Sequence, residues 1–153
     1  MHFLEMDMRL TLQTDYALRV LMYLAANQSS LVTIADTSRK FGISRNHLMK
    51  IAHVLGTRGY IETVRGRSGG MRLAKPAREI NIGRLTRDME NDSAFLECFP
   101  GGQGNCLITP SCRLKGLMSA ALEAFYSSLD RHTLAGLTEG NSRLADLLME
   151  NAA

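Results

Sequence analysis

Residues 44–74 read SRNHLMKIAHVLGTRGYIETVRGRSGGMRLA, and this stretch decides the fold. Ser44 can cap a helix. One face of that helix is made by apolar residues at three- and four-residue spacing, namely Leu48, Ile51, Ala52 and Leu55. Residues 60–65 favour a strand, residues 66–70 form a glycine-rich turn, and residues 71–74 can return as the partner strand. The stretch therefore predicts a helix followed by a β-hairpin.

Two more helices are expected before this stretch. The first begins near Thr14 or Asp15 and is indicated by apolar residues at helical spacing, namely Leu18, Leu21, Met22 and Ala25. The second is capped by Thr33, and Gly42 supplies the turn before the third helix. Two short helices joined by a glycine turn are typical of a helix-turn-helix, and the basic hairpin after them is typical of a wing. We expect a mainly α fold with a small β-hairpin, in which residues 8–80 form a winged helix-turn-helix domain.

The second half, residues 81–153, is expected to be helical. A short helix is expected over residues 81–89, and Thr109 can cap a long helix that has Pro110 at its first position and ends near Leu129. The apolar stripe of this helix consists of Leu114, Leu117, Met118, Ala121, Leu122, Phe125 and Leu129. A compact winged domain cannot cover so long a stripe, so we expect a homodimer with Leu122 in its interface. Packing against the chain's own helices is the alternative.

Composition and charge point to a globular protein that meets a polyanion. The chain of 153 residues is 45% hydrophobic and 22% charged, as expected for a globular domain. No apolar run is long enough for a membrane span and no secretory signal precedes the first helix, so we expect a cytoplasmic protein without membrane association. Residues 1–75 contain 11 Lys or Arg against five Asp or Glu, whereas the second half is acidic. This division suits a nucleic-acid-binding module joined to a different one, although chance unevenness is the simpler alternative.

The candidate DNA-reading residues lie at the start of the third helix and in the turn of the hairpin. A recognition helix places its first residues against base edges in the major groove of double-stranded DNA. Here those residues are Arg45, Asn46 and His47, followed by Met49 and Lys50 about one turn later. In the wing, Arg65 and Arg67 can meet phosphates or enter a minor groove. A solvated polar helix face is the alternative, and a palindromic operator read by a dimer would give one weak surface enough specificity.

All three cysteines, Cys98, Cys106 and Cys112, lie close together in the spacing C-x7-C-x5-C. An odd number of cysteines in a reducing compartment disfavours disulfides and favours metal or redox chemistry. Cys112 is expected in the first turn of the long helix, where free N–H groups attract an anionic iron–sulfur cluster. Zinc would normally use paired cysteines at shorter spacing, and structural cysteines are the third alternative. A cluster-binding loop and dimerisation helices are therefore expected in residues 81–153.

Four motifs together resemble the NsrR family of nitric-oxide-sensing repressors and, more distantly, the IscR regulators: TLQTDYALRVLMYLA, SRNHLMKI, RGRSGGMRLAKP and CLITPSCRLKG. The resemblance begins at Met8, which would be the initiator. It implies a dimeric winged-helix repressor in which Cys98, Cys106 and Cys112 hold a 4Fe–4S cluster, rather than a 2Fe–2S cluster, that nitric oxide destroys. It also implies that Asp15 supplies a carboxylate ligand across the dimer interface. Arg19, one turn along, would pair with Asp15 or with the partner's helix.

Two departures from these families concern the cysteine segment. The first cysteine interval is longer here, by the stretch PGGQG, and Lys115 stands where IscR-type proteins have a histidine ligand. The expected function is a repressor that releases its operator when the cluster is nitrosylated or lost. The alternatives are an IscR-type regulator of iron–sulfur or redox status, and a zinc or thiol protein-interaction module. No enzymatic activity is expected, because the sequence contains no nucleophile–base motif, P-loop or dinucleotide fingerprint.

Overall fold

The computed structural model describes residues 10–90 and 94–149, so the expected start at Met8 lies outside the described residues. Its elements, in chain order, are α1 (Leu12–Ala26), α2 (Ile34–Phe41), α3 (Arg45–Thr57), β1 (Ile61–Val64), β2 (Gly70–Leu73), η1 (Ala77–Glu79), α4 (Ile82–Glu90), η2 (Thr109–Ser111), α5 (Arg113–Leu129), α6 (Leu134–Thr138) and α7 (Ser142–Met149). The fold is mainly helical with one hairpin, as predicted. None of the described helices is long and apolar enough to cross a membrane.

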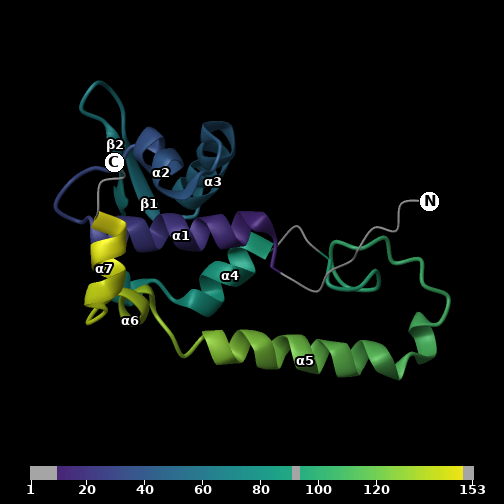
Figure 1. The fold of residues 1–153 in the computed structure, drawn as a ribbon. Helices are drawn as coiled ribbons and strands as arrows, with labels where there is room; N and C mark the ends of the chain where they lie inside the picture. The colour runs from purple at the N-terminus through teal and green to yellow at the C-terminus, as the bar shows by residue number, and fades with distance from the viewer. Residues whose placement is uncertain (1–9, 91–93, 150–153) are drawn as a thin grey trace.

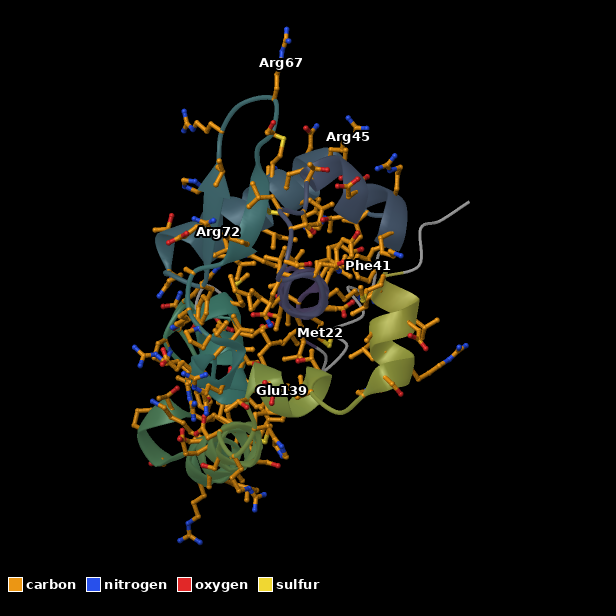
Figure 2. All side chains as sticks on the ribbon, turned by 90° about the vertical axis from the view of Figure 1, so that its left-hand side faces the viewer. Met22, Phe41, Arg45, Arg67, Arg72 and Glu139 are labelled. Atoms are coloured by element: carbon orange, nitrogen blue, oxygen red, sulfur yellow. The ribbon has the colours of Figure 1, made fainter. Side chains whose placement is uncertain are left out.

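The first helix, α1, lies at the centre of the molecule. Figure 2 looks along its axis and shows other elements around it, and α1 contacts α3, α4, α6, α7 and β2. Of the predicted stripe only Leu21 is buried, and Leu18, Met22 and Ala25 are half-buried against the core. Because the neighbours of α1 lie on several sides, the other buried residues fall outside that stripe and include Thr14, Ala17, Val20 and Leu24. The helix also begins earlier than predicted, because the Thr11 side chain accepts a hydrogen bond from the backbone N–H of Thr14.

The helix-turn-helix follows the local signals in the sequence. Thr33 caps α2 in a reciprocal capping box with Asp36, and Gly42 ends α2 with φ of 66°, a left-handed conformation that glycine adopts without strain. Ser44 then caps α3 by accepting a hydrogen bond from the N–H of His47. The four predicted apolar residues of α3 are all buried. These predictions are confirmed.

The wing is a two-stranded antiparallel hairpin. Strand β1 pairs with β2 in the register Ile61↔Leu73 to Val64↔Gly70, and the turn between them extends away from the helices (Figure 1). A bridge from Val32 to Met71 attaches β2 to the segment before α2. At Gly70 an added Cβ would lie 2.9 Å from the Val32 carbonyl oxygen, so this attachment requires glycine.

The long helix is shorter than predicted at its start. Thr109 and Pro110 form a single 3-10 turn, and Cys112 interrupts it with an extended backbone (φ −83°, ψ 110°), so that α5 begins at Arg113. Its end at Leu129 agrees with the prediction. The chain then returns to the winged helix, where Leu134 of α6 is fully buried in the same core as α1 and α3. One hydrophobic core thus contains residues from both sides of the predicted domain boundary between residues 80 and 81. The boundary itself stays a prediction.

Candidate functional site

The candidate DNA-binding residues lie at one end of the molecule. Figure 2 shows Arg45 of α3 and Arg67 of the wing at the same end, both directed away from the core. Arg45, Asn46, Lys50, Arg65 and Arg67 are exposed. The structure therefore brings the two predicted groups, one on a helix and one on a hairpin, to a common face.

His47 differs from the other candidates because it is half-buried. Its ring packs against that of Tyr16 of α1 in a T-shaped arrangement, with ring centroids 5.0 Å apart and an interplanar angle of 71°. The guanidinium carbon of Arg19 also lies over the Tyr16 ring, 5.7 Å from its centre. His47 therefore also packs the start of α3 against α1, a role that its sequence position did not indicate.

An open groove runs between α3 and the wing. Its lining includes Met49 and His53 from α3 and Val64 and Arg65 from the hairpin. Met49 is 57% exposed and Val64 is 39% exposed, so the groove presents apolar surface beside the arginines. Met49 follows Arg45 by one helical turn and so falls on the face of α3 that was predicted to read DNA. The contribution of Val64 from the hairpin was not predicted.

Asp15 and Arg19 form an ion pair within α1. The Arg19 Nη2 lies 2.8 Å from Asp15 Oδ2, and Nε lies 3.1 Å from Oδ1, so the guanidinium binds the carboxylate through two hydrogen bonds. Both side chains are about two-fifths exposed, at 42% and 41%. Arg19 was expected to pair either with Asp15 or with the helix of a partner subunit, and within the single chain it pairs with Asp15.

The three cysteines are free thiols in a segment outside the core. Cys98 and Cys112 are half-buried and Cys106 is exposed. In Figure 1 this segment, coloured green, lies beyond the N-terminal end of α5. Residues 99–105 form a loop that contains neither helix nor strand. Within the described ranges no three His, Cys, Asp or Glu side chains are grouped to hold a metal ion.

The chemistry of the cysteine segment nevertheless fits an iron–sulfur cluster. Three thiols without disulfides are the ligand type that iron–sulfur clusters use. Between Cys106 and Cys112, the hydroxyl oxygen of Thr109 is buried without a hydrogen-bond partner in the described structure. Cys112 is the N-cap of α5 rather than a residue of its first turn, and its side chain makes no capping hydrogen bond. The adjacent N–H groups of α5 thus still favour an anionic group.

The apolar stripe of α5 divides into two sides. Half-buried residues recur at helical spacing as Met118, Leu122, Tyr126 and Leu129. Tyr126 on this side contacts Arg87 of α4, whose guanidinium carbon lies 4.6 Å from the ring centre. The other side is exposed at Leu114 (53%), Leu117 (65%) and Phe125 (43%). Leu122 therefore belongs to the side that faces the chain's own α4, and Leu117 to the side without cover in the described chain.

Helix α4 joins α5 to α1, a connection that sequence reasoning missed. Arg87 binds Asp130 through two hydrogen bonds of 2.6 and 2.9 Å, and these hold the pKa of the Asp130 carboxyl below its ordinary value. Glu90 accepts hydrogen bonds from the Thr11 N–H at 2.8 Å, the Thr11 hydroxyl at 2.9 Å and the Thr14 hydroxyl. These partners are far apart in the sequence, and no local motif indicates them.

Comparison with solved structures shows the same fold in known regulators. The oxidised form of Staphylococcus aureus CymR matches with a TM-score of 0.66 and 27% identity, covering 86% of this chain and 97% of CymR. The T. potens IscR structure matches with a TM-score of 0.66 and 21% identity, covering 97% of this chain and 96% of that one. These matches confirm the winged-helix fold class.

Sequence comparison identifies the family. The chain is 47% identical to the HTH-type transcriptional regulator NsrR of Geobacillus kaustophilus, over 94% of this chain and 98% of that protein. It is 44% identical to the NsrR of Bacillus licheniformis, over 92% of this chain and 99% of that protein. The resemblance to NsrR is thus confirmed, and the absence of enzymatic activity agrees with a family of regulators. Residues 10–140 match the family model of Rrf2, described as an iron-dependent transcriptional regulator. This chain belongs to the Rrf2 family of transcriptional regulators.

Proposed function

We propose that this protein is a cytoplasmic repressor that binds a palindromic DNA operator as a homodimer and senses nitric oxide through a 4Fe–4S cluster. The observation that carries the proposal is the combination of near-full-length identity to NsrR regulators with three free thiols in one segment outside the core. In this proposal Cys98, Cys106 and Cys112 hold the cluster. The partner subunit's Asp15 completes the ligand set.

DNA binding is assigned to the face that contains α3 and the wing. Arg45 and Asn46 are exposed in the first turn of α3, where side chains reach base edges in the major groove. Arg65 and Arg67 extend the positive charge along the hairpin, where they can contact the phosphate backbone of the DNA beside the bases that α3 reads. The acidic Glu62 of the wing is paired with Arg72 across the strands at 3.0 Å, which offsets its repulsion of phosphates.

Dimerisation is assigned to the exposed side of α5. Leu114, Leu117 and Phe125 form an apolar row on a helix that has no buried residue. Burying such a row against a second copy is favourable, at about 25 cal/mol per Å² of apolar surface. A two-fold arrangement would also repeat the recognition helix, which suits a palindrome.

The cluster, when bound, supplies a centre that reacts with nitric oxide. Sulfur ligands suit iron better than oxygen does, so the carboxylate of Asp15 is the weakest of the four proposed ligands. Arg19 offers this carboxylate a partner within its own chain. Asp15 therefore has two alternative partners, and the choice between them can change how the start of α1 is held.

One experiment tests the cluster and its role in DNA binding together. The protein is purified anaerobically, its iron and sulfide are assayed, and its absorption spectrum is recorded before and after addition of nitric oxide. We expect about four iron and four sulfide per chain and loss of operator binding after nitric oxide. A colourless protein with bound zinc would support the thiol-interaction alternative instead. Operator affinity that is equal with and without the cluster would refute the switch.

A further inference from the structure

Tyr60 lies where the recognition helix and the wing meet. Its N–H donates to the Leu55 carbonyl of α3 at 2.9 Å, and its carbonyl accepts from the Ala74 N–H, just after β2, at 3.0 Å. Its side chain is only 2% exposed. Because β1 begins at the next residue, any displacement of Tyr60 shifts the wing relative to α3.

The hydroxyl of Tyr60 connects this junction to α4. It donates a hydrogen bond to Asp88 Oδ2 at 2.5 Å. Arg58, the C-cap of α3, places Nη1 3.7 Å from Asp88 Oδ1. Burial, and then the hydrogen bond to Asp88 and its negative charge, raise the pKa of Tyr60, so the hydroxyl keeps its proton and stays a donor. Asp88 thus contacts both the end of the recognition helix and the start of the wing.

Another side of α4 is attached to α5 by the preceding residue, Arg87. Arg87 binds Asp130 at 2.6 Å and lies 3.5 Å from Glu123 of α5. Successive residues of a helix point about 100° apart, so Arg87 and Asp88 reach in different directions from one turn of α4. One turn of α4 therefore contacts both α5 and the base of the wing.

We propose that Asp88 is a positioning residue for operator recognition, which fixes the spacing of α3 and the wing through Tyr60 and Arg58. The proposal rests on the DNA binding proposed above. Reading a specific site requires α3 and the wing to engage the duplex at once, whereas nonspecific binding to phosphates needs only positive charge. Loss of the Asp88 contacts should therefore reduce the preference for the operator and leave nonspecific affinity nearly unchanged.

The test uses full-length protein purified anaerobically and two duplex probes. Wild-type protein first enriches a sequence from a random duplex pool, and that duplex and a shuffled version are then titrated at fixed salt. We expect Tyr60→Phe and Asp88→Ala each to lower the ratio of the two affinities about tenfold, the equivalent of one hydrogen bond to a charged group. The double variant should be no worse than the worse single variant, because both remove the same contact. Asp88→Asn should keep most of the ratio, since its amide oxygen can accept from Tyr60.

Tyr23→Phe is the matched control, because it removes the hydroxyl of another buried tyrosine in the same winged helix. Its affinity ratio should stay within about twofold of wild type. A lower unfolding midpoint of Tyr60→Phe with an unchanged ratio would overturn the proposal, because Asp88 would then serve only stability. The proposal would also be overturned if the losses in affinity ratio of the two single variants multiplied in the double variant. A wild-type chain that enriches no duplex would instead refute the proposed DNA binding itself.

Discussion

Replacing Glu90 by alanine should destabilise the whole winged helix, although Glu90 lies outside it in α4. The carboxylate accepts three hydrogen bonds from Thr11 and Thr14 at the start of α1. In Glu90→Ala the fully buried Thr14 hydroxyl can still bond to the Thr11 hydroxyl, 3.2 Å away. Thr11 is only partly buried, so its N–H can donate to a water molecule instead. The net loss then corresponds to one or two hydrogen bonds to a charged acceptor, about 2–3 kcal/mol.

Urea unfolding followed by circular dichroism, at one protein concentration, measures this loss. For a chain of this size, a loss of this magnitude should also lower the melting temperature by about 5–10 °C. Glu90→Gln keeps an acceptor oxygen without the charge and should lose about half as much. Glu139→Ala, at an exposed glutamate, serves as the matched control and should change stability by less than about 0.5 kcal/mol. A Glu90→Ala protein as stable as that control would refute the reasoning.

Four further predictions concern the DNA, dimer, cluster and acid response. Arg45→Ala should weaken operator binding by about 1–3 kcal/mol in titrations and barely affect shuffled DNA; equal operator affinity would remove Arg45 from the reading surface. Leu117→Glu should give monomers in sedimentation, because a buried interface would contain an unpaired carboxylate, and a wild-type monomer at micromolar concentration would contradict this. Cys106→Ala should lose iron, sulfide and specific DNA binding together; retained operator binding without iron would count against the switch. Hydrogen bonding with Thr33 lowers the pKa of Asp36 below 3.8, so its stabilisation is present above about pH 4 and is lost as pH falls through the folded-state value. Asp36→Asn should therefore flatten the acid side of the stability profile, and an unchanged slope would exclude this role.

Local signals predicted the winged helix well because they act within a few residues. Ser44 and Thr33 cap helices as their positions indicate, and Gly42 takes the left-handed conformation expected after α2. The predicted start of α5 was wrong because Pro110 fits the beginning of a short 3-10 turn as well as that of an α-helix. The extended backbone of Cys112 then delays the helix.

The contacts that connect the elements could not be predicted in the same way. Glu90 and Thr11 are separated by 79 positions, and Tyr60 and Asp88 by 28, so no periodicity relates them. The two sides of α5 follow the same apolar spacing, and only the packing of α4 shows that Leu122 lies on the half-buried one. For the candidate site, residue types and spacing indicated the three thiols, whereas the described part of the chain does not group them to hold a metal ion.

The central position of α1 also determines what kind of response this regulator can give. Five other elements contact this helix, and its Ala17 and Leu21 have no exposed surface. Protein interiors are packed as densely as crystals, so an enclosed helix cannot slide by small increments. Any movement of α1 is therefore expected to take it from one discrete packed position to another. A signal that reaches Asp15 at the start of α1 should therefore switch each molecule fully from one state to the other, and a graded response would arise only from the proportion of molecules that have switched.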